Sequence, residues 1–195
     1  MCGRFFIDES TLKEIVKIIN SIDQNIYNRD FQSDIYPTNL SPVISAIKKD
    51  TKIDSKIWGY PHFKNKGVII NARSETVLEK KIFANGIKNN RSIIPATHFY
   101  EWNENKEKNT LTRKDLKTMY MAGFFDNFQG EDRFVILTTE ANDSMIKIHN
   151  RMPLILEESQ IEDYLMKEDK LEYILNQVPT KLESYSKIEQ QSMFL

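Results

Sequence analysis

The sequence predicts a single α+β domain with an antiparallel, barrel-like β-sheet as its core and helices at the periphery. Short runs of aromatic and β-branched residues, separated by polar stretches, fill the middle of the chain and are typical of strands. Amphipathic helices are predicted near both ends. No internal repeat, low-complexity tract or Gly/Ser-rich linker interrupts the chain, so residues 1–195 are expected to form one domain.

The first helix is predicted over residues 9–20, where Asp8 and Ser10 can cap its start. Its apolar residues recur at helical spacing: Leu12, Ile15, Val16 and Ile19. The predicted strands cover residues 43–47, 56–60, 69–72, 93–102, 119–125, 134–139 and 152–156. Further helices are predicted at residues 74–85, 141–149, 158–166 and 168–176. The C-terminal region, about residues 157–195, is therefore expected to be acidic and helical and to cover one edge of the sheet.

Composition restricts the class of protein. A hydrophobic content of 40% with 11% aromatic residues excludes a disordered chain, and no apolar run approaches the roughly 20 residues that cross a bilayer. One cysteine cannot form an internal disulfide, and the N-terminus lacks a secretory signal pattern, so we expect a cytoplasmic protein without a membrane partner. The common nucleotide and zinc motifs are missing from the sequence, so no cofactor or metal is expected.

The charge distribution is uneven, although the net charge of -1 gives no global indication of nucleic-acid binding. Residues 60–95 contain seven basic against two acidic residues, and residues 155–195 contain nine acidic against four basic residues. A basic segment suits a phosphate-bearing partner, but solvated lysines on helix faces explain it equally well.

The only cysteine in the chain is Cys2, directly behind the initiator methionine. Methionine aminopeptidases generally remove Met1 when the second residue is small. The α-amine, with a pKa of about 8, would then lie beside a thiol with a pKa of about 8.5. Such a pair can condense with an aldehyde into a five-membered thiazolidine ring, or act as an N-terminal nucleophile on a carbonyl. The alternative is a small apolar residue in a buried N-terminal strand.

Two further polar stretches interrupt the strand-rich middle. In NARSET, Asn71 and Arg73 occupy alternate positions and therefore share one face of an extended segment. In IIPATHFYEW, Glu101 is the only acid, and a carboxylate held among apolar residues is suited to general acid or base catalysis. Exposure of Glu101 at the surface is the commoner alternative.

The remaining candidates follow the last predicted strands. ILTTEAN offers Thr138 and Thr139 at a strand end, and IHNRMP carries His149 and Arg151 beside an apolar segment. A lone histidine such as His149 is more often structural than catalytic. Each of these motifs is therefore weak evidence for a catalytic site when it is taken alone.

Taken together, MCGRF, NARSET, IIPATHFYEW, TTEAN and IHNRMP resemble, in order and in spacing, the SOS-response-associated peptidase (SRAP) family. The motif-bearing core covers about residues 2–156. The resemblance implies a monomeric sensor of abasic sites in single-stranded DNA that acts in the DNA-damage (SOS) response. It also implies a covalent thiazolidine crosslink to the lesion, lyase-like activity and autoproteolytic removal of the residue before the cysteine.

The resemblance assigns roles to individual residues. Cys2 is the nucleophile, Asn71 positions the reacting terminus, Glu101 serves as acid and base, and His149 assists Schiff-base formation and opening of the sugar ring. The remaining residues are assigned to DNA binding: Arg4, Arg73 and Arg151 on phosphates, Trp102 on a neighbouring base, and Thr139 beside them.

The chain also departs from the family pattern. The segment at residues 58–71 is shorter and poorer in tryptophan, and His62 or Phe63 is expected to stack in its place. Thr97 and His98 replace the Asp-Gly pair that is common in the family. Lower affinity for DNA is the expected consequence.

Two other classes of protein compete with this interpretation. An N-terminal-nucleophile amidohydrolase, such as a class II glutamine amidotransferase, would use Cys2 to form an acyl-enzyme and would need an oxyanion hole. A noncatalytic single-strand binding module would need neither Cys2 nor Glu101.

Overall fold

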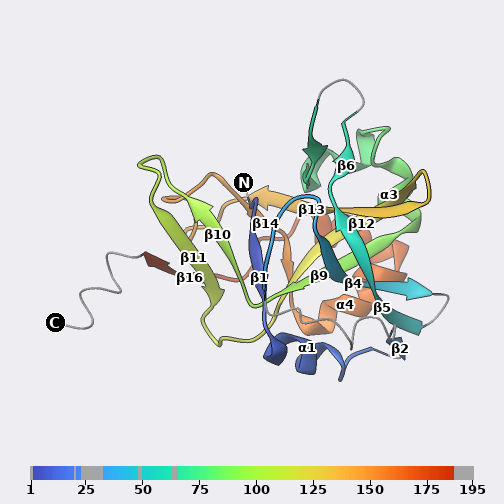
Figure 1. The fold of residues 1–195 in the computed structure, drawn as a ribbon, viewed down its shortest axis with the longest axis horizontal. Helices are drawn as coiled ribbons and strands as arrows, with labels where there is room; N and C mark the ends of the chain where they lie inside the picture. The colour runs from blue at the N-terminus through green and yellow to red at the C-terminus, as the bar shows by residue number, and fades with distance from the viewer. Residues whose placement is uncertain (1, 20, 23–32, 48–49, 63–65, 187–195) are drawn as a thin grey trace.

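The computed structural model describes residues 2–19, 21–22, 33–47, 50–62 and 66–186, and its centre is a closed five-stranded barrel (Figure 1). The barrel strands are β4 (Leu40–Ile47), β5 (Asp50–Trp58), β9 (Arg91–Ala96), β12 (Met119–Phe128) and β13 (Glu131–Glu140). Antiparallel pairing runs from β5 through β4, β9 and β12 to β13, and parallel pairing of β13 with β5 closes the ring. The predicted α+β fold with a barrel-like core is confirmed, and the parallel closure is an addition.

A second, five-stranded sheet lies against the barrel (Figure 1). In spatial order its strands are β16 (Leu182–Ser186), β11 (Lys108–Arg113), β10 (His98–Trp102), β1 (Phe5–Ile7) and β3 (Ser33–Ile35). The Phe5 ring contacts the Trp58 ring of the barrel, with 5.0 Å between the ring centres. All the pairings in this sheet are antiparallel, and β16 covers its edge at β11, as expected for the C-terminal region.

Short strands attach two candidate motifs to β13. Strand β8 (Asn71–Arg73) pairs with β13 in parallel, and β14 (Arg151–Pro153) pairs with it antiparallel. Thr138 of β13 is paired with Arg73 in β8 and with Pro153 in β14. The remaining strands are β2 (Ser21–Ile22), β6 (Tyr60–Pro61), β7 (Val68–Ile69) and β15 (Ile155–Leu156). The NARSET and IHNRMP motifs are therefore brought together by one barrel strand.

Helices surround this core. They are α1 (Glu9–Ile15), η1 (Ser74–Glu79), α3 (Ala84–Asn89), η2 (Glu158–Gln160), α4 (Ile161–Met166), η3 (Glu168–Lys170) and α5 (Leu171–Leu175). The buried Tyr164 hydroxyl donates to the Gly123 carbonyl at 2.7 Å, which fixes α4 on the barrel. Among the described residues, no helix is long and apolar enough to cross a membrane.

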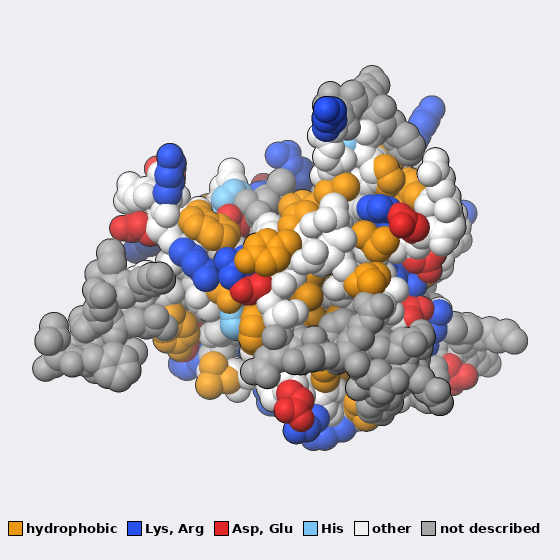
Figure 2. Space-filling view, viewed as in Figure 1, with side chains coloured by type: hydrophobic (Ala, Val, Ile, Leu, Met, Phe, Trp, Pro, Cys, Tyr) orange, Lys and Arg blue, Asp and Glu red, His pale blue; other side chains and the backbone are white. Residues whose placement is uncertain are grey.

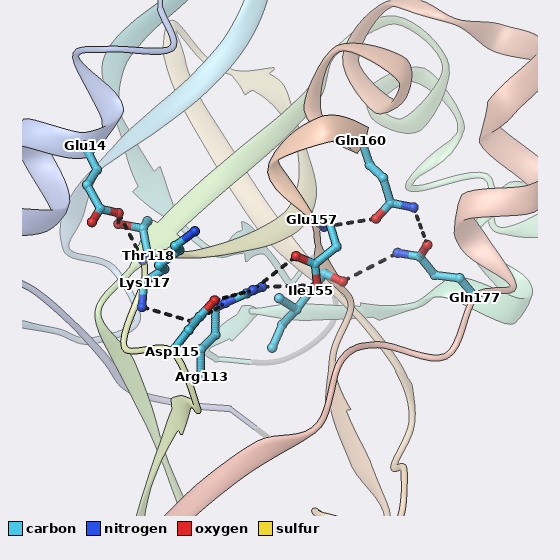
Figure 3. Close-up of polar contacts among 9 residues, drawn as sticks. All are labelled: Glu14, Arg113, Asp115, Lys117, Thr118, Ile155, Glu157, Gln160 and Gln177. Carbon is cyan, nitrogen blue, oxygen red and sulfur yellow. Dashed lines mark hydrogen bonds and ion pairs between the residues drawn. The ribbon is translucent and has the colours of Figure 1, made fainter.

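A chain of polar contacts ties the C-terminal region to the end of β11 (Figure 3). The Arg113 Nε donates to Asp115 at 2.9 Å, and its Nη1 donates to Glu157 at 3.2 Å. Arg113 is the main cause that lowers the pKa of Asp115 to about 2, so the ion pair persists into acidic solution. Gln160 continues the chain and donates to the Gln177 side chain at 2.7 Å. These contacts hold the segment that leads into β16.

Several predicted elements differ from the structure. The predicted helix at residues 141–149 is wrong, because this segment forms turns. The side-chain Oδ1 of Asn142 accepts from the Ser144 backbone N–H at 3.0 Å and from the Ser144 hydroxyl at 2.6 Å. Such side-chain bonds compete with helix formation. The Asn142 amide also donates to the Pro179 carbonyl at 2.9 Å, which fixes the turn against the C-terminal region.

Other predicted elements are divided or shortened. The segment at residues 93–102 forms β9 and β10 in different sheets, and the backbone turns from one to the other at Thr97. The Thr97 hydroxyl accepts from the Asp8 backbone at 3.0 Å and lies 2.8 Å from the Thr11 hydroxyl. The helix predicted at 9–20 ends at Ile15, and the one predicted at 74–85 divides into η1 and α3. The C-terminal region contains β16 in addition to its helices.

Candidate active site

Cys2 lies at the start of the five-stranded sheet and is only 2% exposed. The Asn71 side-chain amide donates to the Cys2 carbonyl at 3.1 Å, so β8 holds the N-terminal segment in place. The Cys2 thiol lies 3.7 Å from the Arg4 carbonyl. Burial, followed by the negative charge of Glu101, raises the pKa of the Cys2 thiol to about 12. The thiol is therefore protonated at neutral pH and needs a base before it can attack.

Glu101 is the candidate for this base. It lies on β10, is 5% exposed, and its Oε1 accepts from the Trp102 backbone at 3.4 Å. The pairing of β1 with β10 brings the Glu101 segment next to the N-terminal segment, and the charge of Glu101 contributes to the raised pKa of the Cys2 thiol. The predicted alternative of a surface carboxylate is thus wrong for Glu101. The buried Oδ1 of Asn71 has no hydrogen-bond donor within the described part of the chain, which leaves an acceptor close to the N-terminus.

We expect the Glu101→Gln substitution to lower the pKa of the Cys2 thiol below the wild-type value, because the nearby negative charge is removed. Burial, the larger cause, remains, so the pKa stays above the ordinary thiol value. Because Cys2 is the only cysteine, protein labelled with ¹³C at cysteine Cβ gives one resonance for titration. Glu104→Gln, at an exposed position, is the control, and equal thiol pKa values in both variants would contradict the contact.

His149 and Arg151 form a second cluster. The Arg151 backbone N–H donates to the His149 Nδ1 at 2.9 Å, so the neutral imidazole carries its proton on Nε2. Both terminal nitrogens of the nearly buried Arg151 guanidinium donate to the Glu75 carboxylate, at 2.6 and 2.8 Å. Its Nη2 also donates to the Thr138 carbonyl at 2.6 Å. Arg151 is therefore held by protein groups and orients the His149 segment.

Glu75 was not singled out by the sequence analysis. It is the acid of NARSET, but its partner comes from IHNRMP, 76 residues away. Burial raises the pKa of the Glu75 carboxyl, but hydrogen bonds from Arg151 and from backbone amides outweigh burial and lower it overall. Through its bonds to Arg151, the Glu75 carboxylate links η1 to β14. Asn71 lies just before η1, and His149 lies just before β14.

Arg4 is also paired within the protein. Its guanidinium forms an ion pair with Asp34 and lies over the rings of Tyr36 and Tyr100. The ion pair raises the pKa of Arg4 and, with the hydrogen bond from Arg4, lowers that of Asp34 in spite of its partial burial. Sequence reasoning missed Asp34 and Tyr36, which belong to a three-residue strand and the turn behind it.

The other predicted DNA-binding residues differ in exposure. Arg73 is exposed, Trp102 is 41% exposed, and Thr139 is buried. His62 is half-buried, whereas Phe63 lies outside the described residues. Within the described ranges, no group of three histidine, cysteine, aspartate or glutamate side chains is arranged to hold a metal ion.

The structure therefore places Cys2, Asn71 and Glu101 in one cluster and His149 with Arg151 in another, with β13 adjoining the strands of both Asn71 and Arg151. The fold and the site define a barrel protein with a buried cysteine near its N-terminus, whose carbonyl is held by a side-chain amide and whose thiol is influenced by a buried carboxylate.

Comparisons with known proteins identify the family of this chain. The family model described as SOS response associated peptidase (SRAP) matches residues 1–191. The chain is 32% identical over 182 residues to the abasic site processing protein YoaM of Bacillus subtilis, covering 85% of this chain and 79% of YoaM. It is 30% identical over 181 residues to YoqW, an abasic site processing protein of the same organism, covering 85% and 80%. The chain belongs to the SRAP family.

A solved structure supports the same fold. The crystal structure of a protein from Bacteroides thetaiotaomicron matches with a TM-score of 0.79 at 25% sequence identity, covering 95% of this chain and 91% of that protein.

Proposed function

We propose that this protein recognises abasic sites in single-stranded DNA and caps them through a covalent thiazolidine formed by Cys2 after removal of Met1. The observation that carries the proposal is the buried Cys2 held by Asn71 beside Glu101. The relatives named as abasic site processing proteins support the choice of lesion. The protein would act as a monomer in the cytoplasm, as part of the DNA-damage response.

The chemistry needs an aldehyde and the two nucleophiles of a free N-terminal cysteine. The α-amine adds to the C1′ aldehyde of the ring-opened deoxyribose and gives a carbinolamine, which loses water to form a Schiff base. The thiol sulfur then adds to the imine carbon, and its proton passes to the imine nitrogen. The sum of these steps is aldehyde plus aminothiol giving thiazolidine plus one water.

The residues of the site match these proton transfers. The raised pKa of the thiol requires a base during ring closure, and the buried Glu101 carboxylate would supply it. Asn71 can accept from the freed α-amine through its buried Oδ1, while its amide holds the Cys2 carbonyl at 3.1 Å. His149, with its proton on Nε2, would assist opening of the sugar ring.

Two finer activities complete the proposal. Removal of Met1 by the protein itself would be a peptidase activity restricted to its own N-terminus, with the Cys2 thiol as the nucleophile. Schiff-base formation with the lesion is also the first step of a lyase reaction, which ring closure by the thiol would intercept.

The test is incubation of purified protein with a single-stranded oligonucleotide that contains one abasic site. We expect a crosslink that survives heat and SDS, with an added mass equal to the DNA minus one water. Intact mass of the protein should show loss of Met1. The same oligonucleotide with a tetrahydrofuran residue, which has no aldehyde, is the control and should give no crosslink.

Other outcomes decide between the classes of protein. A protein that hydrolyses glutamine and gives no crosslink would be an amidohydrolase. A protein that binds both oligonucleotides without crosslinking either would be a noncatalytic binding module. Active protein that retains Met1 would contradict the role of the α-amine.

A further inference from the structure

The outer face of the five-stranded sheet carries an aromatic and basic surface. Side chains alternate between the two faces of a strand. Four buried side chains, one from each of four strands, define the inner face: Phe5, Ile35, Phe99 and Leu111. The residues next to them in sequence, Arg4, Tyr36 and Tyr100, therefore belong to the opposite face.

The register of the strands aligns these three residues. Phe5 pairs with Ile35 on one side and with Phe99 on the other, so the preceding Arg4 lies between Tyr36 and Tyr100. The Arg4 guanidinium carbon is 4.9 Å from the centre of the Tyr36 ring and 4.6 Å from that of Tyr100. The Lys108 Nζ lies 3.7 Å from the Tyr100 ring centre. The four side chains form a continuous stack of aromatic rings and cations, here called the Tyr36–Lys108 stack.

The Tyr36 end of the stack is open to solvent and held in place. Tyr36 is 45% exposed. Its backbone N–H donates to the Asn39 side chain at 3.0 Å, and its carbonyl accepts from the Asn39 backbone at 3.0 Å. Figure 2 shows hydrophobic and basic side chains gathered left of the centre, over the strands labelled β1, β10 and β11 in Figure 1. A fixed, exposed ring loses little conformational freedom when a flat ligand stacks on it.

Asp34 changes what Arg4 can contribute. The ion pair between Arg4 and Asp34 compensates the guanidinium charge, so Arg4 mainly stiffens the stack between the two rings. Lys108 adds a second positive charge to this face, and with two cations around the single Asp34 carboxylate the stack keeps a net positive charge that attracts a phosphate. Rings combined with cations suit single-stranded nucleic acid, because every base has a face to stack and every nucleotide a phosphate.

We propose that the Tyr36–Lys108 stack binds nucleotides that flank the abasic site, with a base stacked on Tyr36 and a phosphate paired with Lys108. Arg4, in the middle of the stack, is only two residues from Cys2, so the stack lies close to the reacting terminus and a bound strand would reach this face from it. The inference rests on the proposed function, and it assigns the flanking DNA to one particular side of the site.

The test separates binding from chemistry. Affinity is measured by fluorescence anisotropy for single-stranded DNA with a central tetrahydrofuran residue, which binds but cannot crosslink. We expect Tyr36→Ala to weaken binding roughly 5- to 150-fold, the range given by the loss of one stacked base. Tyr36→Phe, which keeps the ring, should bind like wild type. Tyr173→Ala, at a tyrosine of α5 that is 70% exposed, is the matched control.

Lys108 is tested through salt dependence. Lys108→Ala should reduce the slope of log Kd against log salt concentration by about 0.7, as expected for one lost phosphate contact to a single strand. Lys13→Ala, at an exposed lysine of α1, should leave the slope unchanged. Oligonucleotides with flanking nucleotides on only the 5′ or only the 3′ side should show the Tyr36→Ala effect for one side alone.

The two proposals fail in different ways. If wild type crosslinks abasic DNA but Tyr36→Ala and Lys108→Ala bind like their controls, the flanking-nucleotide site is wrong and the proposed function stands. If wild type neither crosslinks abasic DNA nor binds the tetrahydrofuran oligonucleotide, the proposed function is wrong, and the stack has no DNA to bind.

Discussion

Cys2→Ala is expected to abolish the heat-stable crosslink to abasic DNA, with a loss on the order of 100-fold or more. The substitution removes the thiol that closes the ring and that would cleave off Met1, but alanine is also small, so methionine aminopeptidase can still remove Met1 and expose the α-amine. The Schiff base should therefore still form reversibly and be captured as a covalent adduct when borohydride is added. SDS gels with and without heating, and with and without borohydride, distinguish the two products.

Cys2→Ser provides the matched comparison. The hydroxyl keeps the size of the side chain but is a far weaker nucleophile, so we again expect only the borohydride-dependent adduct. Thermal unfolding should confirm that both variants are folded, because Cys2 belongs to the buried core. A heat-stable crosslink of wild-type yield in either variant would show that ring closure by the thiol is not the capping reaction.

The distribution of apolar residues along the sequence predicts most of the strands, but not the pairing that closes the barrel. The runs at residues 119–125 and 134–139 are rich in apolar and aromatic residues because β12 and β13 are buried over most of their length. Nothing local indicates that β13 also pairs in parallel with β5, since Phe134 and Trp58 are 76 residues apart. Strand identity is a local property of the chain, whereas pairing is set by long-range contacts.

The site shows the same division between local and long-range information. Cys2, Asn71 and Glu101 come from motifs that the sequence displays, and the structure brings them together. The acidic residues that form ion pairs with the arginines are harder to predict from the sequence. Arg4 and Arg151 resemble free phosphate ligands in sequence, yet Asp34 and Glu75 neutralise them in the structure. These acids come from a three-residue strand and a 3-10 helix, which have little periodic signal.

The second large effect is expected at Glu75, whose carboxylate holds Arg151 through two hydrogen bonds of 2.6 and 2.8 Å. Glu75→Gln leaves one acceptor and no charge, so the guanidinium loses its fixed orientation. The backbone N–H of Arg151 donates to the Nδ1 of His149 and so fixes the imidazole ring. If Arg151 shifts, His149 shifts with it, and crosslinking should slow on the order of 10- to 100-fold. The measurement is the single-turnover crosslinking rate at saturating abasic DNA.

Binding and chemistry should respond differently to this substitution. An Arg151 released from Glu75 has a guanidinium available to phosphate, so affinity for the tetrahydrofuran oligonucleotide should be unchanged or higher while the chemical step slows. Glu75→Asp keeps the charge and should recover part of the rate. Glu79→Gln, at an exposed position of the same 3-10 helix, is the control.

The state of His149 gives an independent measure of the same effect. In wild type, ¹⁵N spectra of the three histidines should show His149 with its proton on Nε2, because its Nδ1 accepts a backbone hydrogen bond. The lowered pKa of Glu75 keeps the carboxylate ionised as pH falls through mildly acidic values, so this tautomer should persist wherever His149 is neutral. In Glu75→Gln the preference for Nε2 should weaken. Wild-type crosslinking together with an unchanged tautomer would show that the ion pair does not position His149, and that Arg151 serves only to join the strands.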